Sequence, residues 1–218
     1  MLFRSDKLRK CLMLIFGGLF LILAIQVRFN LLFIHVMNDG AELAVHNFIP
    51  QFVQQGIGFA GLLTHYWLAI LGIIGLSGLF YLVNYKIAMG WLIATQILGL
   101  LVVELLSTLL TTYWDKGFKM GPMMPDLLLV WWFQILAIIA VIIVPRLTAN
   151  WQWQWGIQLL VVFGWCLMAL ARMQQNGMPL SSELGALCFG YFWWQLSEQQ
   201  YRRHAKHWRH VLEIDTLI

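Results

Sequence analysis

Apolar runs separated by short polar breaks recur along the whole chain. An apolar helix of about 20 residues crosses a hydrocarbon layer of about 30 Å. An α-helix also pairs its backbone groups within one segment, whereas an isolated strand in lipid leaves them unpaired. The pattern therefore predicts an all-α integral membrane protein, a six-helix transmembrane bundle with spans at residues 11–27, 64–83, 88–110, 127–144, 156–171 and 182–199.

The stretch between the first two predicted spans is less uniform. Over residues 42–53 apolar and polar positions recur near helical spacing, which is typical of an amphipathic helix lying along the membrane interface. We expect this helix on the external side, with a kink at Pro50 because proline lacks a backbone N–H. Residues 151–155, with the sequence WQWQW, are expected at the interface ahead of the fifth span.

Composition supports a membrane protein built as one unit. Hydrophobic residues make up 61% of the 218 residues and charged residues only 11%, and the mean hydropathy is +0.74. This apolar content is higher than a soluble domain of this length needs for its core. No Pro/Ser/Gly-rich linker divides the chain, so we expect a single transmembrane domain over residues 1–218 with a basic tail at 200–218. The three cysteines lie in apolar runs without CxxC spacing, which predicts no disulfide framework, metal site or cofactor.

The net charge of +4 comes from basic residues concentrated near the two chain ends. Ten of the 14 lysines and arginines fall in segments that the six-span topology places in the cytoplasm. The positive-inside rule explains this asymmetry better than nucleic-acid binding does. We therefore expect a multi-pass protein of the bacterial inner membrane, anchored by an uncleaved first span, with both termini in the cytoplasm.

Two polar segments, residues 113–126 and 172–183, are predicted on the same external side, and each joins successive spans. They can form one site at the membrane surface. The second lies within ARMQQNGMPLSSELGA, residues 171–186, and contains Arg172. Its neutral donors include Asn176 and Ser182.

This layout resembles the type 2 phosphatidic acid phosphatase (PAP2) superfamily, which removes phosphate from membrane lipids. That family has a six-helix core and the signatures KxxxxxxRP, PSGH and SRxxxxxHxxxD, with one histidine as nucleophile and another as general acid. Arg172 fits the arginine of the third signature, and Leu184-Gly185 fits the LG that commonly follows its aspartate. The family histidine then falls at Met178 and the aspartate at Ser182, next to Glu183.

The other two signatures are less complete. Residues 124–128, MPDLL, keep only the proline of PSGH, and Leu128 takes the position of the general-acid histidine. Pro122 could correspond to the RP proline, with Lys116 and Lys119 as displaced basic residues. A methionine cannot attack phosphorus and a leucine cannot protonate a leaving alkoxide.

The resemblance therefore implies a PAP2-like protein without catalysis. We expect it to bind a lipid phosphate or pyrophosphate head group, such as that of an undecaprenyl carrier. Alternatively, it acts as an accessory subunit with another membrane protein in an envelope-lipid or cell-wall-polymer pathway. The alternative is that these polar residues only solvate helix ends at the interface. The head-group site would consist of Arg172, Lys116, Lys119, Asn176 and Ser182.

Two other functions stay open at the level of sequence. One is an active phosphatase with a rearranged site, acting on phosphatidic acid or undecaprenyl pyrophosphate and using His46 or His65 with Arg172. The other is a lipid transporter or membrane scaffold that keeps only the fold. The glycine spacing in the second predicted span is also compatible with a homo-oligomer.

Glu104 is a further candidate because an acid within a span is a functional candidate by default. It could relay protons or bind an ion, but pairing with Arg172, Lys116 or Lys119 is the simpler expectation. His204, His207 and His210 are spaced by three on a basic segment, as metal ligands could be. Interleaved arginines and lysines favour instead a helix resting on anionic lipid.

Overall fold

The computed structural model describes residues 7–110, 124–148 and 150–211, with side chains described as far as His204. Every regular element in these ranges is a helix. The bounds are α1 Lys7–Arg28, α2 Leu32–Asn47, α3 Gln51–Leu63, α4 Tyr66–Leu82, α5 Lys86–Leu109, α6 Leu127–Ile138, the π-helix η1 Ile139–Ile143, α7 Val144–Leu147, α8 Trp151–Asn176 and α9 Leu180–Val211.

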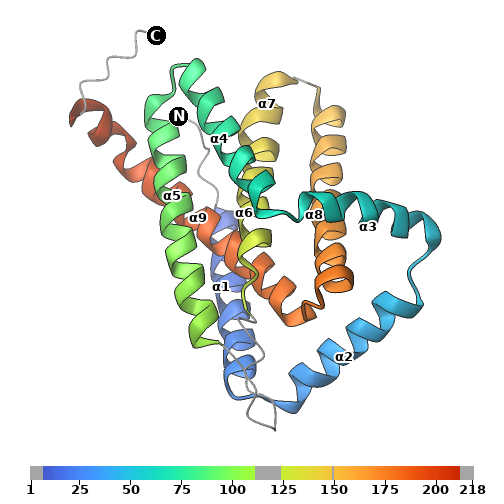
Figure 1. Cartoon of the computed structure of the whole chain (residues 1–218). Coiled ribbons are helices and arrows are strands. Elements are labelled where there is room, and N and C mark those ends of the chain that lie inside the picture. Colours follow the sequence, from blue (N-terminus) through green and yellow to red (C-terminus); the bar gives the residue numbers. More distant parts are fainter. Residues whose placement is uncertain (1–6, 111–123, 149, 212–218) are drawn as a thin grey trace.

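Six helical segments run alternately up and down through the bundle: α1, α4, α5, α6 with its continuation to α7, α8 and α9 (Figure 1). Helices α1 and α9 are antiparallel neighbours, since Arg9 contacts Glu198 whereas Phe20 packs on Phe189. We call the end at which α6 begins, α8 ends and α9 begins the Arg172 end of the bundle; it is the lower end in Figure 1. In chain order these segments overlap the six predicted spans, but not all of them have the length and composition to cross a membrane.

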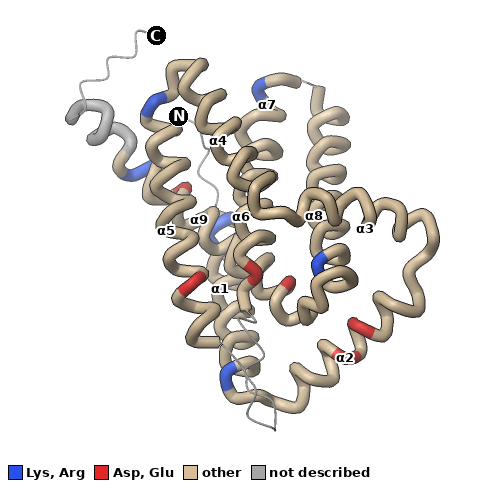
Figure 2. Tube along the Cα trace, viewed as in Figure 1, with Lys and Arg blue, Asp and Glu red and all other residues tan. Residues whose placement is uncertain are grey.

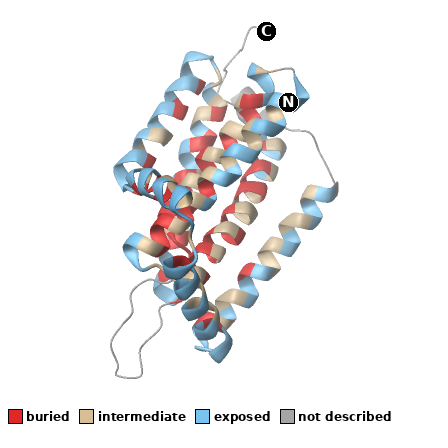
Figure 3. Ribbon diagram, turned by 90° about the vertical axis from the view of Figure 1, so that its right-hand side faces the viewer, coloured by how far each residue is buried: buried red, intermediate tan, exposed pale blue. Residues whose placement is uncertain are grey.

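Four helical segments in the described part of the chain are long and apolar enough to cross a membrane. A fifth is obtained if α3 and α4, which are bent by 70° at their junction, count as one span. Many large apolar residues of α1, α5 and α8 are exposed, as lipid-facing residues are, and Figure 3 shows the buried positions on the faces that the helices turn toward one another. The four segments are Leu8–Arg28, Lys86–Leu109, Leu127–Leu147 and Trp151–Asn176.

The all-α membrane protein is thus confirmed, whereas the sixth predicted span is not among these candidates. Helix α9 occupies that position and packs against α1, α2, α5 and α6. It buries polar side chains, including Gln195 and Glu198, which are 4% and 0% exposed. These buried polar residues and the basic sequence of its last turns make α9 less apolar than the other long helices.

The predicted interfacial helix over residues 42–53 is corrected by the structure to parts of two helices. Helix α2 ends at Asn47 and α3 begins at Gln51, with Pro50 at the N-cap of α3. Proline cannot donate a backbone hydrogen bond and disfavours helical geometry in the residue before it, so the chain turns here. Together α2 and α3 form a V that projects from the bundle, with α3 packed on α8 (Figure 1).

Two other boundaries differ from the predicted spans. The fourth span extends past Pro145 to Leu147, because the π-helical turn Ile139–Ile143 lies just ahead of the proline and removes the normal helical pairing there. The fifth begins at Trp151 and includes the WQWQW stretch, since the Asn150 side chain caps the helix by accepting from the N–H of Gln152 at 3.0 Å.

Candidate functional site

The predicted polar loop at 172–183 is mostly helical, which corrects the expectation from sequence. Helix α8 continues to Asn176, and α9 begins at Leu180, so only three residues form the turn. Gly177 adopts φ 62°, a left-handed conformation that glycine tolerates, and its N–H donates to the carbonyl oxygen of Arg172. Arg172 therefore projects from the last turns of a regular helix.

Arg172 forms a buried ion pair with Asp126. Its Nε donates to Asp126 Oδ2 at 2.8 Å, and the two side chains are 7% and 1% exposed. The other oxygen, Oδ1, caps α6 by accepting from the N–H groups of Leu128 at 2.8 Å and Leu129 at 3.3 Å. One carboxylate thus neutralises the arginine, satisfies the start of α6 and joins α6 to α8.

The first turn of α9 lies beside this pair. The backbone N–H of Asp126 reaches the carbonyl oxygen of Ser182 at 3.5 Å. Ser182 is 0% and Glu183 2% exposed, and neither side chain has a hydrogen-bond partner among the described residues. Glu183 interacts electrostatically with both Asp126 and Arg172. A buried carboxyl group without a donor is unfavourable in its charged form, so Arg172 and Asp126 are the charged centre of this cluster.

The segment just before α6 packs closely against α9 at Gly185. A side-chain carbon at this residue would lie 2.5 Å from the Cγ atom of Met124, just before α6. Glycine therefore allows the start of α6, with Asp126, to approach the start of α9. The Leu184-Gly185 pair that carried the family resemblance has this structural role here.

The residues at the family's catalytic positions are largely enclosed. Leu128, at the general-acid position, is 0% exposed within α6, and Ser182, at the aspartate position, is 0% exposed in α9. Met178, at the nucleophile position, lies in the α8–α9 turn and lines a pocket. The three positions therefore do not share one open cavity lined by described residues.

The predicted head-group residues are only partly brought together. Arg172 and Ser182 lie in the buried cluster, whereas Asn176 is exposed at the end of α8. Lys116 and Lys119 lie outside the described residues. Sequence reasoning did not select Asp126, although an aspartate directly before the apolar run LLLVWWF is a typical N-cap signal.

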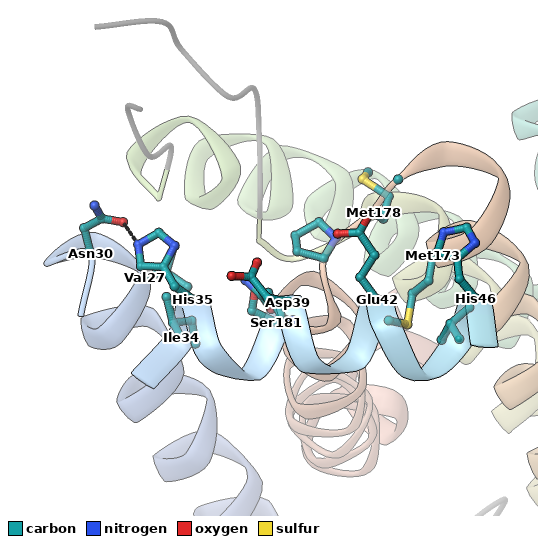
Figure 4. Close-up of a pocket in the computed structure, with 14 residues that line it drawn as sticks. Val27, Asn30, Ile34, His35, Asp39, Glu42, His46, Met173, Met178 and Ser181 are labelled. Carbon is teal, nitrogen blue, oxygen red and sulfur yellow. Dashed lines mark hydrogen bonds between the residues drawn. The ribbon is translucent and has the colours of Figure 1, made fainter. Parts of the chain in front are cut away.

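A pocket of about 140 Å³ lies at the Arg172 end, between α2 and the α8–α9 turn (Figure 4). One face of α2 carries polar side chains toward it, among them His35, Asp39, Glu42 and His46. The Asn38 side chain accepts from the N–H of Ser181 at 3.0 Å and thereby holds α2 against α9. His46 and Met178 line this same pocket, whereas the exposed His65 precedes α4 and Arg172 lies outside the lining.

Glu104 is exposed on α5, and no ion pair forms between it and Arg172, whose partner is Asp126. Its other two predicted partners, Lys116 and Lys119, lie outside the described residues. Within the described part of the chain, no group of three His, Cys, Asp or Glu side chains is placed to hold a metal ion.

A second buried charge lies near the other end of α9. Glu198 is 0% exposed, and its Oε1 lies 3.4 Å from Arg9 and 3.7 Å from Arg202. Among the described residues, the other charges are scattered over several helices, and α2 carries two acidic residues (Figure 2). The basic tail predicted at 200–218 is helical as far as Val211, and at least one of its arginines pairs within the bundle.

Comparison with family models, with curated proteins and with solved structures finds no match to this chain. The resemblance to the PAP2 superfamily accordingly stays a prediction that rests on the residues named above.

Proposed function

We propose that this chain is a non-catalytic, PAP2-like protein of the bacterial inner membrane that binds a lipid head group or acts as an accessory subunit in an envelope-lipid pathway. The observation that best supports the non-catalytic part of this proposal is the buried pair between Arg172 and Asp126. In a lipid phosphatase the arginine would face the phosphate. Here its charge is already neutralised inside the protein, and it holds α6 and α8 together.

The side chains at the family's other positions support the absence of turnover. Leu128 is enclosed in the core and carries no proton to donate, and Ser182 has no histidine to orient. Losing a covalent nucleophile lowers a rate by several orders of magnitude, so an accidental arrangement of neighbouring groups would not restore useful hydrolysis.

Phosphate binding at Arg172 requires competition with Asp126. A guanidinium carries five N–H donors, and Asp126 uses the one at Nε in the described pair. A head group that reaches the terminal nitrogens would still meet a nearby carboxylate. We therefore expect weak binding of phosphatidic acid by the wild type and tighter binding by Asp126→Asn, which keeps the cap on α6 but removes the negative charge.

The experiment has two readouts on purified full-length protein in detergent. Inorganic phosphate release from phosphatidic acid and undecaprenyl pyrophosphate measures turnover, and the melting temperature with each lipid measures binding. We expect no release above background. We also expect a lipid-dependent rise in melting temperature, measured against the lipid-free value of each variant, that is larger in Asp126→Asn and absent in the double variant Arg172→Met, Asp126→Asn, which carries neither charge. Release that the double variant abolishes would contradict the non-catalytic proposal. No response to either lipid would leave the scaffold alternative.

An active phosphatase with a rearranged site is the second candidate. It is favoured by one observation: His46 and Met178, the latter at the nucleophile position, line the same pocket. If phosphate release is found, His46→Ala should abolish it under this alternative, whereas His65→Ala tests the other predicted imidazole. Equal rates in all three proteins would exclude both histidines as the nucleophile.

A further inference from the structure

We propose that a lateral groove between α1, α5 and α9 holds one acyl chain of an anionic phospholipid, whose phosphate is bound by Arg28. Neither Arg172 nor Asp126 lines this groove. The inference therefore does not rest on the proposed function, and either proposal can fail without the other.

The lateral groove exists because two helices share a neighbour without closing on each other. Helices α1 and α5 both pack against α9, but the contact between α1 and α5 is slight. Phe189 and Phe192 of α9 line the space between them, together with Leu106 of α5. On the side of α1, Gly17 and Gly18 line it, and the absence of a side chain at both positions leaves it open.

The walls of the lateral groove match hydrocarbon. Every described residue that lines it is an apolar residue or a glycine. Helices α1 and α5 are both long and apolar enough to cross a membrane, so lipid rather than water surrounds the groove. Association within lipid is driven largely by van der Waals packing, which an acyl chain lying in the groove provides and an empty groove does not.

The size of the lateral groove suits one long chain. Its volume is about 450 Å³. A methylene group occupies about as much space as a water molecule, whose share of the liquid is about 30 Å³. The groove therefore has room for about 15 methylene groups. A transmembrane helix of about 20 residues would cover the groove rather than fill it.

A cation lies at the end of the two helices that form the walls. Both α1 and α5 end at the Arg172 end of the bundle (Figure 1). Arg28, the last residue of α1, is exposed, and its Nη1 donates to the carbonyl oxygen of Leu109 at 3.2 Å. This bond holds the guanidinium at the end of α5, three residues beyond Leu106.

The charge of Arg28 is available to an anionic head group. Among the described residues Arg28 forms no ion pair, and its hydrogen bond to Leu109 uses only one of its nitrogens. An exposed arginine at the end of a membrane span lies at the level of the lipid phosphates, and a guanidinium binds phosphate with charge-assisted hydrogen bonds.

The distance between Arg28 and the lateral groove fits a glycerophospholipid. Leu21 is the last residue of α1 that lines the groove, and it precedes Arg28 by seven residues, about 10 Å along the helix axis. The glycerol backbone and the first carbons of a chain span this distance. A phosphate at Arg28 therefore places the rest of one chain between α1 and α5.

The head-group part is tested by native mass spectrometry of the purified full chain in detergent, titrated with long-chain phosphatidylglycerol. We expect one lipid to bind with saturation. Phosphatidylcholine with the same chains should bind more weakly, because its choline group cancels the negative charge. Arg28→Gln should lower the affinity for phosphatidylglycerol about tenfold, the effect of losing one charge-assisted hydrogen bond. Arg28→Lys keeps the charge and should lower it less.

The chain part is tested by Gly18→Leu, which leaves Arg28 in place. A side-chain carbon at Gly18 would have no neighbour within 4 Å, so leucine fits there without displacing other groups and fills part of the groove. The affinity for phosphatidylglycerol should fall about tenfold, as for other overfilled apolar sites. Gly164→Leu is the matched control, because Gly164 also has open space around it but lies on α8, away from the groove, and this variant should bind as the wild type does.

Several results would overturn the proposal. It is wrong if the two lipids bind equally well, if Arg28→Gln or Gly18→Leu binds phosphatidylglycerol as tightly as the wild type, or if Gly164→Leu loses as much affinity as Gly18→Leu. A dimer that Gly18→Leu disrupts would also overturn it, because the groove would then bind a second copy of the chain. Short-chain phosphatidic acid does not fill the groove, so measurements at Arg172 with that lipid keep the two proposals apart.

Discussion

Removing one charge of the Arg172–Asp126 pair should destabilise the protein strongly, whereas removing both should not. The two side chains are 7% and 1% exposed, and Nε lies 2.8 Å from Oδ2. Asp126→Asn keeps an acceptor for the N-terminus of α6 but leaves a buried, unpaired guanidinium. The expected loss in the free energy of unfolding is about 3–5 kcal/mol. Asp126→Ala also removes the cap and should cost about 1 kcal/mol more.

A double variant distinguishes the free energy of the interaction between the two charges from the effects that each substitution has on its other neighbours. Arg172→Met in the Asp126→Asn background removes both charges and fills much of the same volume. Replacing a buried ion pair by uncharged groups is often close to neutral, so we expect the double variant to recover most of the loss. The coupling free energy, which is the sum of the two single losses minus the loss in the double variant, should be at least about 3 kcal/mol, far above that of residues that do not touch.

The assay is a denaturant titration in detergent, followed by circular dichroism and tryptophan fluorescence, on the wild type, both single variants and the double variant. Arg203→Met serves as the control because Arg203 is exposed, and it should change stability by less than about 0.5 kcal/mol. A cost of less than about 1 kcal/mol for Asp126→Asn, or single losses that simply add in the double variant, would show that the two charges do not stabilise each other.

Three further predictions concern α8 and α9, and each is measured as the free energy of unfolding. Gly177→Ala should cost about 1–2 kcal/mol, because the φ of 62° at this residue is unfavourable for a residue with a side chain. The control Gly164→Ala lies inside α8 with open space around its Cβ and should be neutral or stabilising. Equal effects of the two substitutions would contradict this prediction. Glu183→Met should stabilise by about 1 kcal/mol, since the carboxyl is 2% exposed without a described partner, and a loss would show that it has one. Glu198→Gln should cost about 2 kcal/mol by leaving two arginines without their shared carboxylate, and an unchanged midpoint would count against that network.

Much of the helix layout follows from the length of the apolar runs. The predicted third span at 88–110 is α5, and the predicted first span at 11–27 lies within α1, because a hydrocarbon layer sets the length of apolar helix needed to cross it. Pro50 also marked the break between α2 and α3, although the local periodicity favoured one helix. The pattern of apolar residues predicts a helix well where that helix must satisfy the same requirement on its own, here an apolar length that matches the lipid layer.

The arrangement of polar groups could not be predicted in the same way. Asp126 and Arg172 are 46 residues apart, and no local signal in one sequence pairs them. The polar residues at 172–183 were expected to form a loop because lipid excludes them, but packing of α2, α6 and α9 shields several of them inside helices. For the same reason α9 does not have the composition of a lipid-facing span. The pocket arises from α2 folding back on the α8–α9 turn, which depends on contacts far apart in sequence.

The most direct test of the central claim is a time course of phosphorus-31 NMR on phosphatidic acid mixed with the purified protein. One spectrum shows both events, since hydrolysis produces a new signal of inorganic phosphate and binding broadens the signal of the lipid. We expect no inorganic phosphate, slight broadening with the wild type, more with Asp126→Asn and none with the double variant Arg172→Met, Asp126→Asn. Growth of the inorganic phosphate signal with the wild type, lost in the double variant, would show that the protein is a phosphatase.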